Sequence, residues 1–254
     1  MSGAEWATNV LGAVGGAAVG ALALGAVVCR LNRNIADWVF ARIWLSMSDE
    51  VDKSLKVYKR ELFSSGLTGH VLEVGSGTGV NLKHYTDPQL GKDIESLTML
   101  EPNERLYEKL EEGVNEASGT ARFPIHTIND FFPSDAVATQ QYDAIVFVLV
   151  LCSVKDLRET LHEAYRLLKP GGKLIFLEHV CPPRVSLKYL AALMISPLWT
   201  SYGDGCKLTR QTEEAIVEFD WHETEIERFT KAVPHHGLSL EWLANNIIMG
   251  QATK

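Results

Sequence analysis

The 254-residue sequence predicts an α/β protein built on a doubly wound, mostly parallel sheet. Short apolar runs alternate with helical patterns from about residue 49 onward, which is the pattern of repeated βα units. The first run, Val71–Val74, opens into glycines at alternate positions, as at a strand-to-helix turn. A later run, Tyr142–Leu151, is almost wholly apolar, as expected of a central strand buried on both faces.

The first half of the pattern predicts three helices and two strands. Apolar residues at helical spacing predict a lead-in helix over Asp49–Phe63, before the strand Val71–Val74. The helix after the glycines extends to about residue 85. A second strand is predicted over Leu97–Leu100, and Asn103 is placed to cap a following helix, Glu104–Glu116.

The second half continues the alternation. A weaker third strand is predicted over Phe123–Ile128, before the central strand 142–151. Asp156, with a glutamate three residues later, forms a capping-box-like start for the helix Leu157–Leu168. A Lys-Pro-Gly-Gly sequence ends that helix, and Lys173–Leu177 is the fifth strand. Two terminal strands complete a seven-stranded sheet: Glu223–Phe229 and Ile247–Ala252.

The N-terminal segment carries no charge from Trp6 to Cys29. Residues 10–28 contain only Val, Leu, Ala and Gly, and as a helix they would be roughly 29 Å long, near the hydrocarbon thickness of a bilayer. Arg30 and Arg33 follow at once, which favours a cytosolic position for the rest of the chain. We therefore expect a membrane-anchor helix; a buried glycine-rich helix is the alternative.

Two domains follow from this division. Residues 1–48 are expected to form the membrane anchor and a second, interfacial helix, and residues 49–254 the α/β domain. The second helix, around Ile35–Leu45, has alternating apolar and charged faces, so it either lies at the membrane surface or covers the α/β domain.

Composition excludes some classes of partner and site. The net charge is −8 with no basic stripe, so a nucleic-acid substrate is not expected. The four cysteines form no C-x-x-C pair and the histidines show no metal-ligand spacing, so no metal site is expected. Reduced thiols in a domain facing the cytosol are the simplest interpretation.

The glycine loop is the most informative motif. Its glycines are Gly75, Gly77 and Gly79, and the carboxylate Glu73 precedes them. Val80 stands where a dinucleotide-binding loop requires glycine, which disfavours a nicotinamide dehydrogenase. This spacing resembles motif I of the class I S-adenosylmethionine-dependent methyltransferases, so S-adenosylmethionine is the expected cofactor.

The resemblance extends over most of the chain. An acidic residue ends the second strand, a long fourth strand follows, and Leu-Lys-Pro-Gly-Gly precedes the fifth, as in small-molecule methyltransferases of class I. The blocks Leu149–Lys155, Glu178–Val180 and Asp204–Arg210, with the apolar N-terminus, resemble the membrane-associated methyltransferase-like proteins that S-methylate thiols. The chain departs from that pattern at Glu101, where an aspartate is usual, and in a glycine- and alanine-rich anchor.

The resemblance implies a small hydrophobic thiol as acceptor, membrane lipid as a partner, and attachment to the endoplasmic reticulum or lipid droplets. Ligands of open α/β sheets bind at the carboxyl ends of the strands. There Glu101 is placed to accept hydrogen bonds from both ribose hydroxyls. Glu73 either reaches the methionyl ammonium or supports the loop, and Asn129 and Asp130 either contact the adenine or form an ordinary turn. The residues expected to bind the cofactor are Glu73, Gly75, Ser76, Gly77, Gly79, Glu101, Asn129, Asp130 and Leu149.

The acceptor is expected beyond the fourth and fifth strands. Cys152 and Ser153 are placed to line the methyl-transfer cleft, together with Asp204. His179 is the candidate proton acceptor, although a thiol with a pKa of about 8.5 needs no strong base and a histidine without a catalytic role fits the same position. The apolar stretch Leu187–Trp199 either roofs a hydrophobic pocket or is an ordinary core helix. Two alternatives stay open: methylation of a quinone or lipid at oxygen or carbon, and a tethered cofactor-binding protein without turnover.

Overall fold

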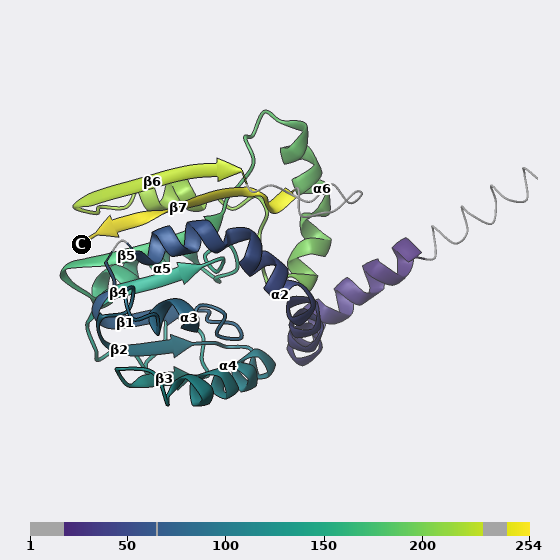
Figure 1. Cartoon of the computed structure of the whole chain (residues 1–254). Coiled ribbons are helices and arrows are strands. Elements are labelled where there is room, and N and C mark those ends of the chain that lie inside the picture. The colour runs from purple at the N-terminus through teal and green to yellow at the C-terminus, as the bar shows by residue number, and fades with distance from the viewer. Residues whose placement is uncertain (1–17, 65, 231–242) are drawn as a thin grey trace, which may run out of the picture.

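A computed structural model describes residues 18–64, 66–230 and 243–254. Its centre is one seven-stranded sheet in the order β3-β2-β1-β4-β5-β7-β6 (Figure 1). The first five strands along the chain pair in parallel, whereas β7 is antiparallel to both β5 and β6. The strands are β1 (Thr68–Val74), β2 (Asp93–Leu100), β3 (Ile125–Ile128), β4 (Tyr142–Val148), β5 (Leu168–His179), β6 (Glu223–Thr230) and β7 (Asn246–Thr253).

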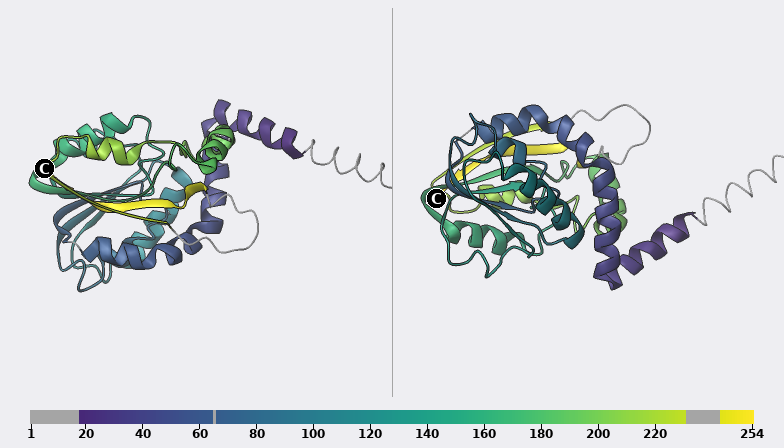
Figure 2. Two further views of the ribbon diagram at one scale, coloured as in Figure 1. Left: turned by 90° about the horizontal axis from the view of Figure 1, so that it is seen from above. Right: turned by 60° about the horizontal axis from the view of Figure 1, so that its bottom comes forward.

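Helices cover both faces of the sheet (Figure 2). Because side chains alternate along a strand, Val71 packs toward one helical layer and Leu72 toward the other. The first layer contains α2, α3 and α4, and the second contains α5 and α7. The helices are α2 (Arg33–Ser64), α3 (Leu82–Tyr85), α4 (Glu104–Ala117), α5 (Leu157–Leu167), α6 (Leu187–Tyr202) and α7 (Thr212–Val217). The predicted doubly wound, mostly parallel sheet is confirmed.

Helix starts follow the predicted capping residues. The Asn103 side chain accepts a hydrogen bond from the backbone N–H of Arg105 at 3.1 Å, and Asp156 accepts one from Glu159 at 3.0 Å. The Lys-Pro-Gly-Gly sequence does not separate helix from strand as expected. It belongs to β5, which begins at Leu168, directly after α5.

The N-terminal region differs most from the prediction. Residues 33–64 form the single helix α2, so the two helices expected on either side of residue 48 are continuous. Its second half packs Leu55, Leu62 and Phe63 into the core beside the sheet. The first half was expected either to lie at the membrane surface or to cover the α/β domain. The structure shows that it contacts the α/β domain, because Asn103 Nδ2 donates to the carbonyl oxygen of Asp37 at 3.1 Å.

The structure does not support the membrane-spanning anchor. Residues 10–17 lie outside the described residues, and residues 18–31 form a helix that packs on α6. Tyr202 donates a hydrogen bond to the carbonyl oxygen of Leu22, and Arg30 donates to Ser201 and to the carbonyl oxygen of Pro197. Within the part of the chain that the structure describes, none of the helices has both the length and the apolar character to cross a bilayer.

Candidate active site at the carboxyl ends of the strands

The glycine loop after β1 has backbone conformations that favour glycine. Gly75, Gly77 and Gly79 have φ angles of +69°, +57° and +79°. The N–H groups of Gly75 and Ser76 donate to the carbonyl oxygen of Leu100 at 2.7 and 3.0 Å, which fixes the loop to the end of β2. The loop and the predicted carboxylate at the end of β2 therefore lie together.

Glu101 bridges the loop and the start of α4. Its Oε2 accepts from the Gly77 N–H at 2.7 Å and its Oε1 from the Asn103 N–H at 2.8 Å. Burial raises the pKa of this carboxyl to about 7, and the neighbouring carboxylates of Asp204 and Glu73 act in the same direction. The structure thus brings Glu101 to the glycine loop, and contact with a ribose stays a prediction.

Glu73 lies buried behind the loop. Its Oε1 accepts from Asn81 Nδ2 at 2.6 Å, so it supports the segment that follows the glycines. Its Oε2 is buried without a hydrogen-bond partner among the described residues. Burial raises the pKa of Glu73 to about 7, whereas the positive charge of Lys59 opposes that rise. A hydrogen bond from the Tyr85 hydroxyl opposes the rise as well, and contact of Glu73 with the methionyl ammonium stays a prediction.

Helix α2 closes the loop from above. A cavity of about 30 Å³ is lined by the glycine loop, by Leu149 and by α2 side chains that include Trp44 and Asp52. It has room for about one water molecule. Trp44 Nε1 is buried and has no hydrogen-bond partner within the described part of the chain, and it would lie 3.3 Å from a Cβ placed on Gly77. Sequence reasoning missed Trp44, because its distance from the loop along the chain gives no signal of this contact.

Two further predicted cofactor residues lie at the end of β3. Asn129 Nδ2 donates to the carbonyl oxygen of Glu101 at 2.8 Å and so joins the ends of β2 and β3. Asp130 accepts hydrogen bonds from the Phe131 N–H at 2.8 Å and from Ser134 Oγ at 2.6 Å. These local bonds are those of an ordinary polar turn, which was one of the two expected roles of Asp130. Asp130 borders an open surface depression of about 780 Å³ between this turn and α5, outside the glycine loop. Their contacts with adenine stay predictions.

The turn after β4 has an unusual backbone. Leu149 has φ +60°, outside the region that most residues adopt, and its N–H donates to the carbonyl oxygen of Leu177 at 2.8 Å. The buried carboxyl of Glu178 accepts from the N–H groups of Val150 and Leu151 at 2.8 and 2.9 Å. These bonds hold the turn against β5, and burial raises the pKa of Glu178 to about 8.

Asp204 lies on the same side of the molecule and faces α2. It has φ +48°, and its Oδ1 forms an ion pair with the Arg33 guanidinium at 2.8 Å. Burial raises the pKa of Asp204, although Arg33 opposes the shift. Strained backbone at functional sites is common, and here it connects the segment after α6 with the helix that covers the glycine loop.

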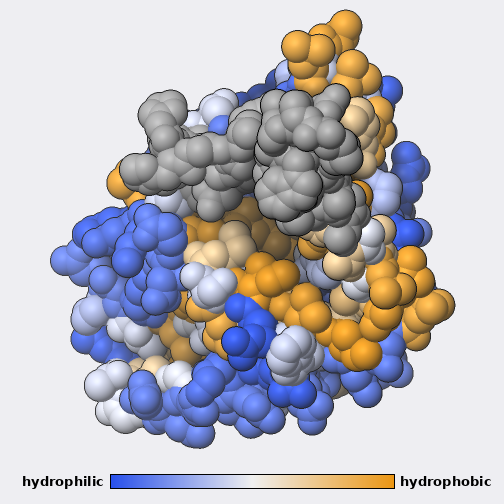
Figure 3. Space-filling model, turned by 90° about the vertical axis from the view of Figure 1, so that its right-hand side faces the viewer, coloured by the Kyte–Doolittle hydropathy of each residue, from blue (hydrophilic) through white to orange (hydrophobic). Residues whose placement is uncertain are grey.

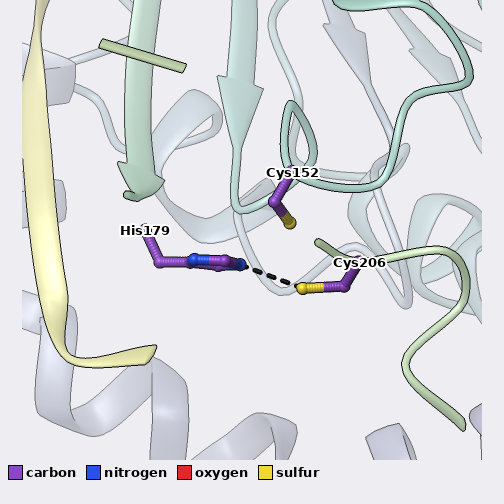
Figure 4. A group of neighbouring side chains, drawn as sticks. All are labelled: Cys152, His179 and Cys206. Carbon is purple, nitrogen blue, oxygen red and sulfur yellow. Dashed lines mark hydrogen bonds between the residues drawn. The ribbon is translucent and has the colours of Figure 1, made fainter. Parts of the chain in front are cut away.

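Three soft ligand atoms meet beside this turn (Figure 4). His179 Nε2 lies 3.0 Å from Cys206 Sγ, and all three ligand atoms of Cys152, His179 and Cys206 lie within 4.8 Å of one another. A hydrogen bond from Cys206 is the largest of the effects that lower the pKa of Cys152. Burial is the largest single effect on His179 and lowers its pKa, but the charge of Cys152, a hydrogen bond with it and the charge of Glu178 together outweigh burial, so the pKa is raised. Ser153 Oγ lies 3.5 Å from Cys152 Sγ.

Cys206 was not among the predicted site residues. The three members of this cluster come from the turn after β4, the end of β5 and the segment after α6, and each lies 27 positions after the previous one. Metal-binding and catalytic cysteine motifs are recognised by short spacings. Only the fold brings these residues together, so the spacing of the cysteines gave no signal.

Comparisons with known proteins agree with this geometry. A family model described as a methyltransferase domain matches residues 47–215. Human thiol S-methyltransferase TMT1B is 33% identical over 225 residues, which are 85% of this chain and 86% of that protein. The chain therefore belongs to the methyltransferase-domain family and is an S-adenosylmethionine-dependent methyltransferase. Within that class, its likeness to TMT1B places it in the family of the thiol S-methyltransferases.

Solved structures share the fold. An S-adenosylmethionine-dependent methyltransferase of Thermotoga maritima superposes with a TM-score of 0.55 at 18% identity, over 86% of this chain and 99% of that one. A phosphoethanolamine N-methyltransferase of Haemonchus contortus, solved with S-adenosylmethionine, superposes with a TM-score of 0.52 at 17% identity, over 80% of this chain and 52% of that one.

The residues at the glycine loop fit the chemistry of S-adenosylmethionine. Glycines with positive φ form the loop, Glu101 offers carboxylate oxygens beside Gly77, and Trp44 Nε1 has no hydrogen-bond partner among the described residues. A carboxylate acceptor and an indole donor are complementary to the amine and carboxylate of an amino acid.

Proposed function

We propose that the protein transfers the methyl group of S-adenosylmethionine to the sulfur of a small hydrophobic thiol. The observation that carries the proposal is the buried cluster of Cys152, His179 and Cys206 beside the turn that borders the glycine-loop cavity. Sulfur and imidazole groups are polarisable and suit a sulfur acceptor. The thiol specificity of the relative TMT1B supports the same acceptor.

The reaction needs alignment more than strong base catalysis. The cofactor supplies an electrophilic methyl group on a sulfonium sulfur, and in-line attack requires the acceptor to be held opposite the bond that breaks. Glu101 and the glycine loop would hold the ribose, Glu73 and Trp44 would hold the amino acid end, and α2 would cover the bound cofactor. His179 Nε2 contacts Cys206, so it acts as a free proton acceptor only if that contact opens.

Matched acceptors test this proposal. Purified full chain is incubated with S-adenosylmethionine and pairs of aryl or alkyl thiols and their alcohol analogues, and methylated products are quantified by mass spectrometry. The proposal expects thioethers without ethers. Equal or preferred methylation of oxygen or carbon would contradict it and would favour a quinone or lipid acceptor. Cofactor binding without any product would favour a binding protein.

We also propose that the protein attaches to the cytosolic face of a membrane, at the endoplasmic reticulum or lipid droplets. Exposed apolar side chains support attachment: they gather on the helix 18–31, the start of α2 and α6, on the side of the molecule shown in Figure 3. Leu31, Leu187 and Met194 are each at least 80% exposed. Contiguous apolar surface of this kind marks interaction sites. The organelle rests on family resemblance alone, and fluorescence microscopy of the tagged full chain tests it.

A further inference from the structure

The cluster of Cys152, His179 and Cys206 has the composition of a metal site. Two sulfur atoms and one imidazole nitrogen lie within 4.8 Å of one another, and all three residues are buried. Zinc in proteins is held by such ligands at about 2.0–2.3 Å, so neighbouring ligand atoms lie within a few ångströms of each other. Small side-chain movements would bring all three atoms onto one ion.

The surrounding structure holds the three ligands in place. The Lys207 N–H donates to the carbonyl oxygen of Cys152 at 3.0 Å, which joins the two cysteine segments directly. The Arg210 guanidinium donates to the carbonyl oxygens of Leu151 and Val154 and so fixes the turn that carries Cys152. These contacts come from the backbone and from outside the ligand set. The site is therefore organised without the ion.

One of the three candidate ligands also accepts a hydrogen bond from a neighbouring side chain. Trp199 Nε1 donates to Cys206 Sγ at 3.1 Å. Hydrogen bonds to ligand atoms orient metal ligands and stabilise thiolate charge. Two thiolates balance the charge of one divalent ion, so the loaded site would be neutral, which suits its burial.

From this geometry we propose that Cys152, His179 and Cys206 bind one soft divalent ion, Zn²⁺ in the first instance, and that its open fourth position holds the acceptor thiol. Catalytic zinc sites typically have three protein ligands and one open position. This proposal rests on the proposed thiol specificity and deepens it. His179 then serves as a ligand and not as a proton acceptor.

Methyl transfer at this site needs only the thiol and S-adenosylmethionine. The thiol binds to the ion and loses its proton to solvent, since coordination deprotonates a thiol. The thiolate sulfur attacks the methyl carbon of S-adenosylmethionine. A new carbon–sulfur bond forms as the sulfonium carbon–sulfur bond breaks, and that electron pair stays on the donor sulfur. The products are a neutral thioether, which is a weak ligand and leaves, and S-adenosylhomocysteine.

The same three residues could serve in two other ways, and the experiment described below distinguishes them from metal binding. A Cys152–Cys206 disulfide would use the two sulfurs and leave His179 without a part. In a metal-free network, Cys206 would donate a hydrogen bond to a Cys152 thiolate beside His179. We favour the ion because two sulfurs and one imidazole nitrogen, all buried, lie within 4.8 Å of one another.

Metal content of the full chain tests the proposal. Metal-depleted protein is loaded with Zn²⁺, desalted and measured by inductively coupled plasma mass spectrometry; Co²⁺ loading reports geometry through thiolate charge-transfer and visible bands. We expect one ion per chain and a tetrahedral Co²⁺ spectrum. Cys206→Ser should weaken binding at least tenfold, and Cys181→Ser, outside the cluster, should leave it unchanged. A thiol acceptor, but not its alcohol analogue, should alter the Co²⁺ spectrum.

The outcomes separate this proposal from the proposed function. A wild-type chain that binds no stoichiometric ion, that forms a Cys152–Cys206 disulfide instead, or that methylates thiols undiminished after metal removal would overturn the metal site and leave thiol methylation standing. Stoichiometric binding that Cys206→Ser abolishes, with a thiol-dependent spectrum but no methyl transfer, would establish the site and refute the proposed function.

Discussion

Gly77 lies where the backbone meets both Glu101 and the indole of Trp44. A valine there would need φ +57°, which β-branched residues strongly avoid, and its Cβ would lie 3.3 Å from Trp44 Nε1. We expect Gly77→Val to abolish S-adenosylmethionine binding in isothermal titration. Gly119→Val is the control, because no heavy atom lies within 4 Å of a Cβ at that position. Undiminished affinity in folded Gly77→Val protein would refute the binding site.

The Glu101 carboxyl should give cofactor binding a pH dependence. With its pKa raised to about 7 in the free protein, it is largely protonated below that pH. The carboxylate is the form that accepts from both ribose hydroxyls, so affinity should rise as pH increases through 7 and then level off. Titrations from pH 5.5 to 8.5 check this.

Removal of the Glu101 charge completes the test. Glu101→Gln should weaken binding above pH 7 by roughly 1.5–3 kcal/mol, the range for a hydrogen bond to a charged group. It should also flatten the pH dependence. The buried carboxylates Asp204 and Glu73 titrate nearby, so a profile that keeps its slope in Glu101→Gln would assign the dependence to them.

Residues of the site differ in how well sequence alone could find them. The glycine loop and Glu101 could be predicted, since both follow strand ends in a motif whose spacing has a physical cause. Trp44 and Cys206 could not, because each reaches the site through the packing of a segment distant in the chain.

Helix α2 is the element that sequence reasoning divided wrongly. The change from its amphipathic first half to its core-packed second half resembles a boundary, but the backbone continues through it. Such continuity depends on what each half packs against, which a local pattern does not contain.

The first half of α2 should report cofactor binding. Trp44 lies over the glycine loop, so bound S-adenosylmethionine must change the surroundings of its indole. We expect a change in intrinsic tryptophan fluorescence on cofactor binding. Trp44→Phe should remove most of it, while Trp221→Phe, which lies in the opposite helical layer, should retain it. An equal change in Trp44→Phe protein would show that α2 does not meet the cofactor.

The second half of α2 is held by buried charges. Asp52 accepts from the buried Lys59 at 2.8 Å and also pairs with Lys83, just after the glycine loop. Asp52→Ala leaves the Lys59 ammonium buried without this partner, so we expect a loss of about 3 kcal/mol of unfolding free energy. Chemical denaturation measures it.

A compensating variant separates burial of charge from loss of packing. Lys59→Met removes the ammonium and keeps most of the side-chain volume. The double variant Asp52→Ala/Lys59→Met should recover much of the lost stability. If it is no more stable than Asp52→Ala, the cost comes from packing and not from the unpaired charge.

At the scale of the whole molecule, the apolar side of helix 18–31 and α6 should bind lipid. We expect full chain to float with liposomes in high salt, because burial of apolar surface is not screened by ions. Leu190→Glu/Met194→Glu should reduce flotation severalfold. Val217→Glu on α7, also exposed, is the matched control. Flotation lost in salt, or unaffected by the α6 changes, would contradict attachment through this surface.

The doubly wound, mostly parallel sheet follows from the alternation of strands and helices, which is why it could be predicted. The structure joins the cofactor loop, the cover formed by α2 and the sulfur–imidazole cluster at one end of the sheet. The most direct test of this arrangement as the active site is a crystal structure of the full chain with S-adenosylhomocysteine. We expect the ribose on Glu101, the amino group toward Glu73, and the donor sulfur facing the turn that carries Cys152. A ligand bound instead in the depression beside Asp130, or a sulfur turned away from that cluster, would contradict the site.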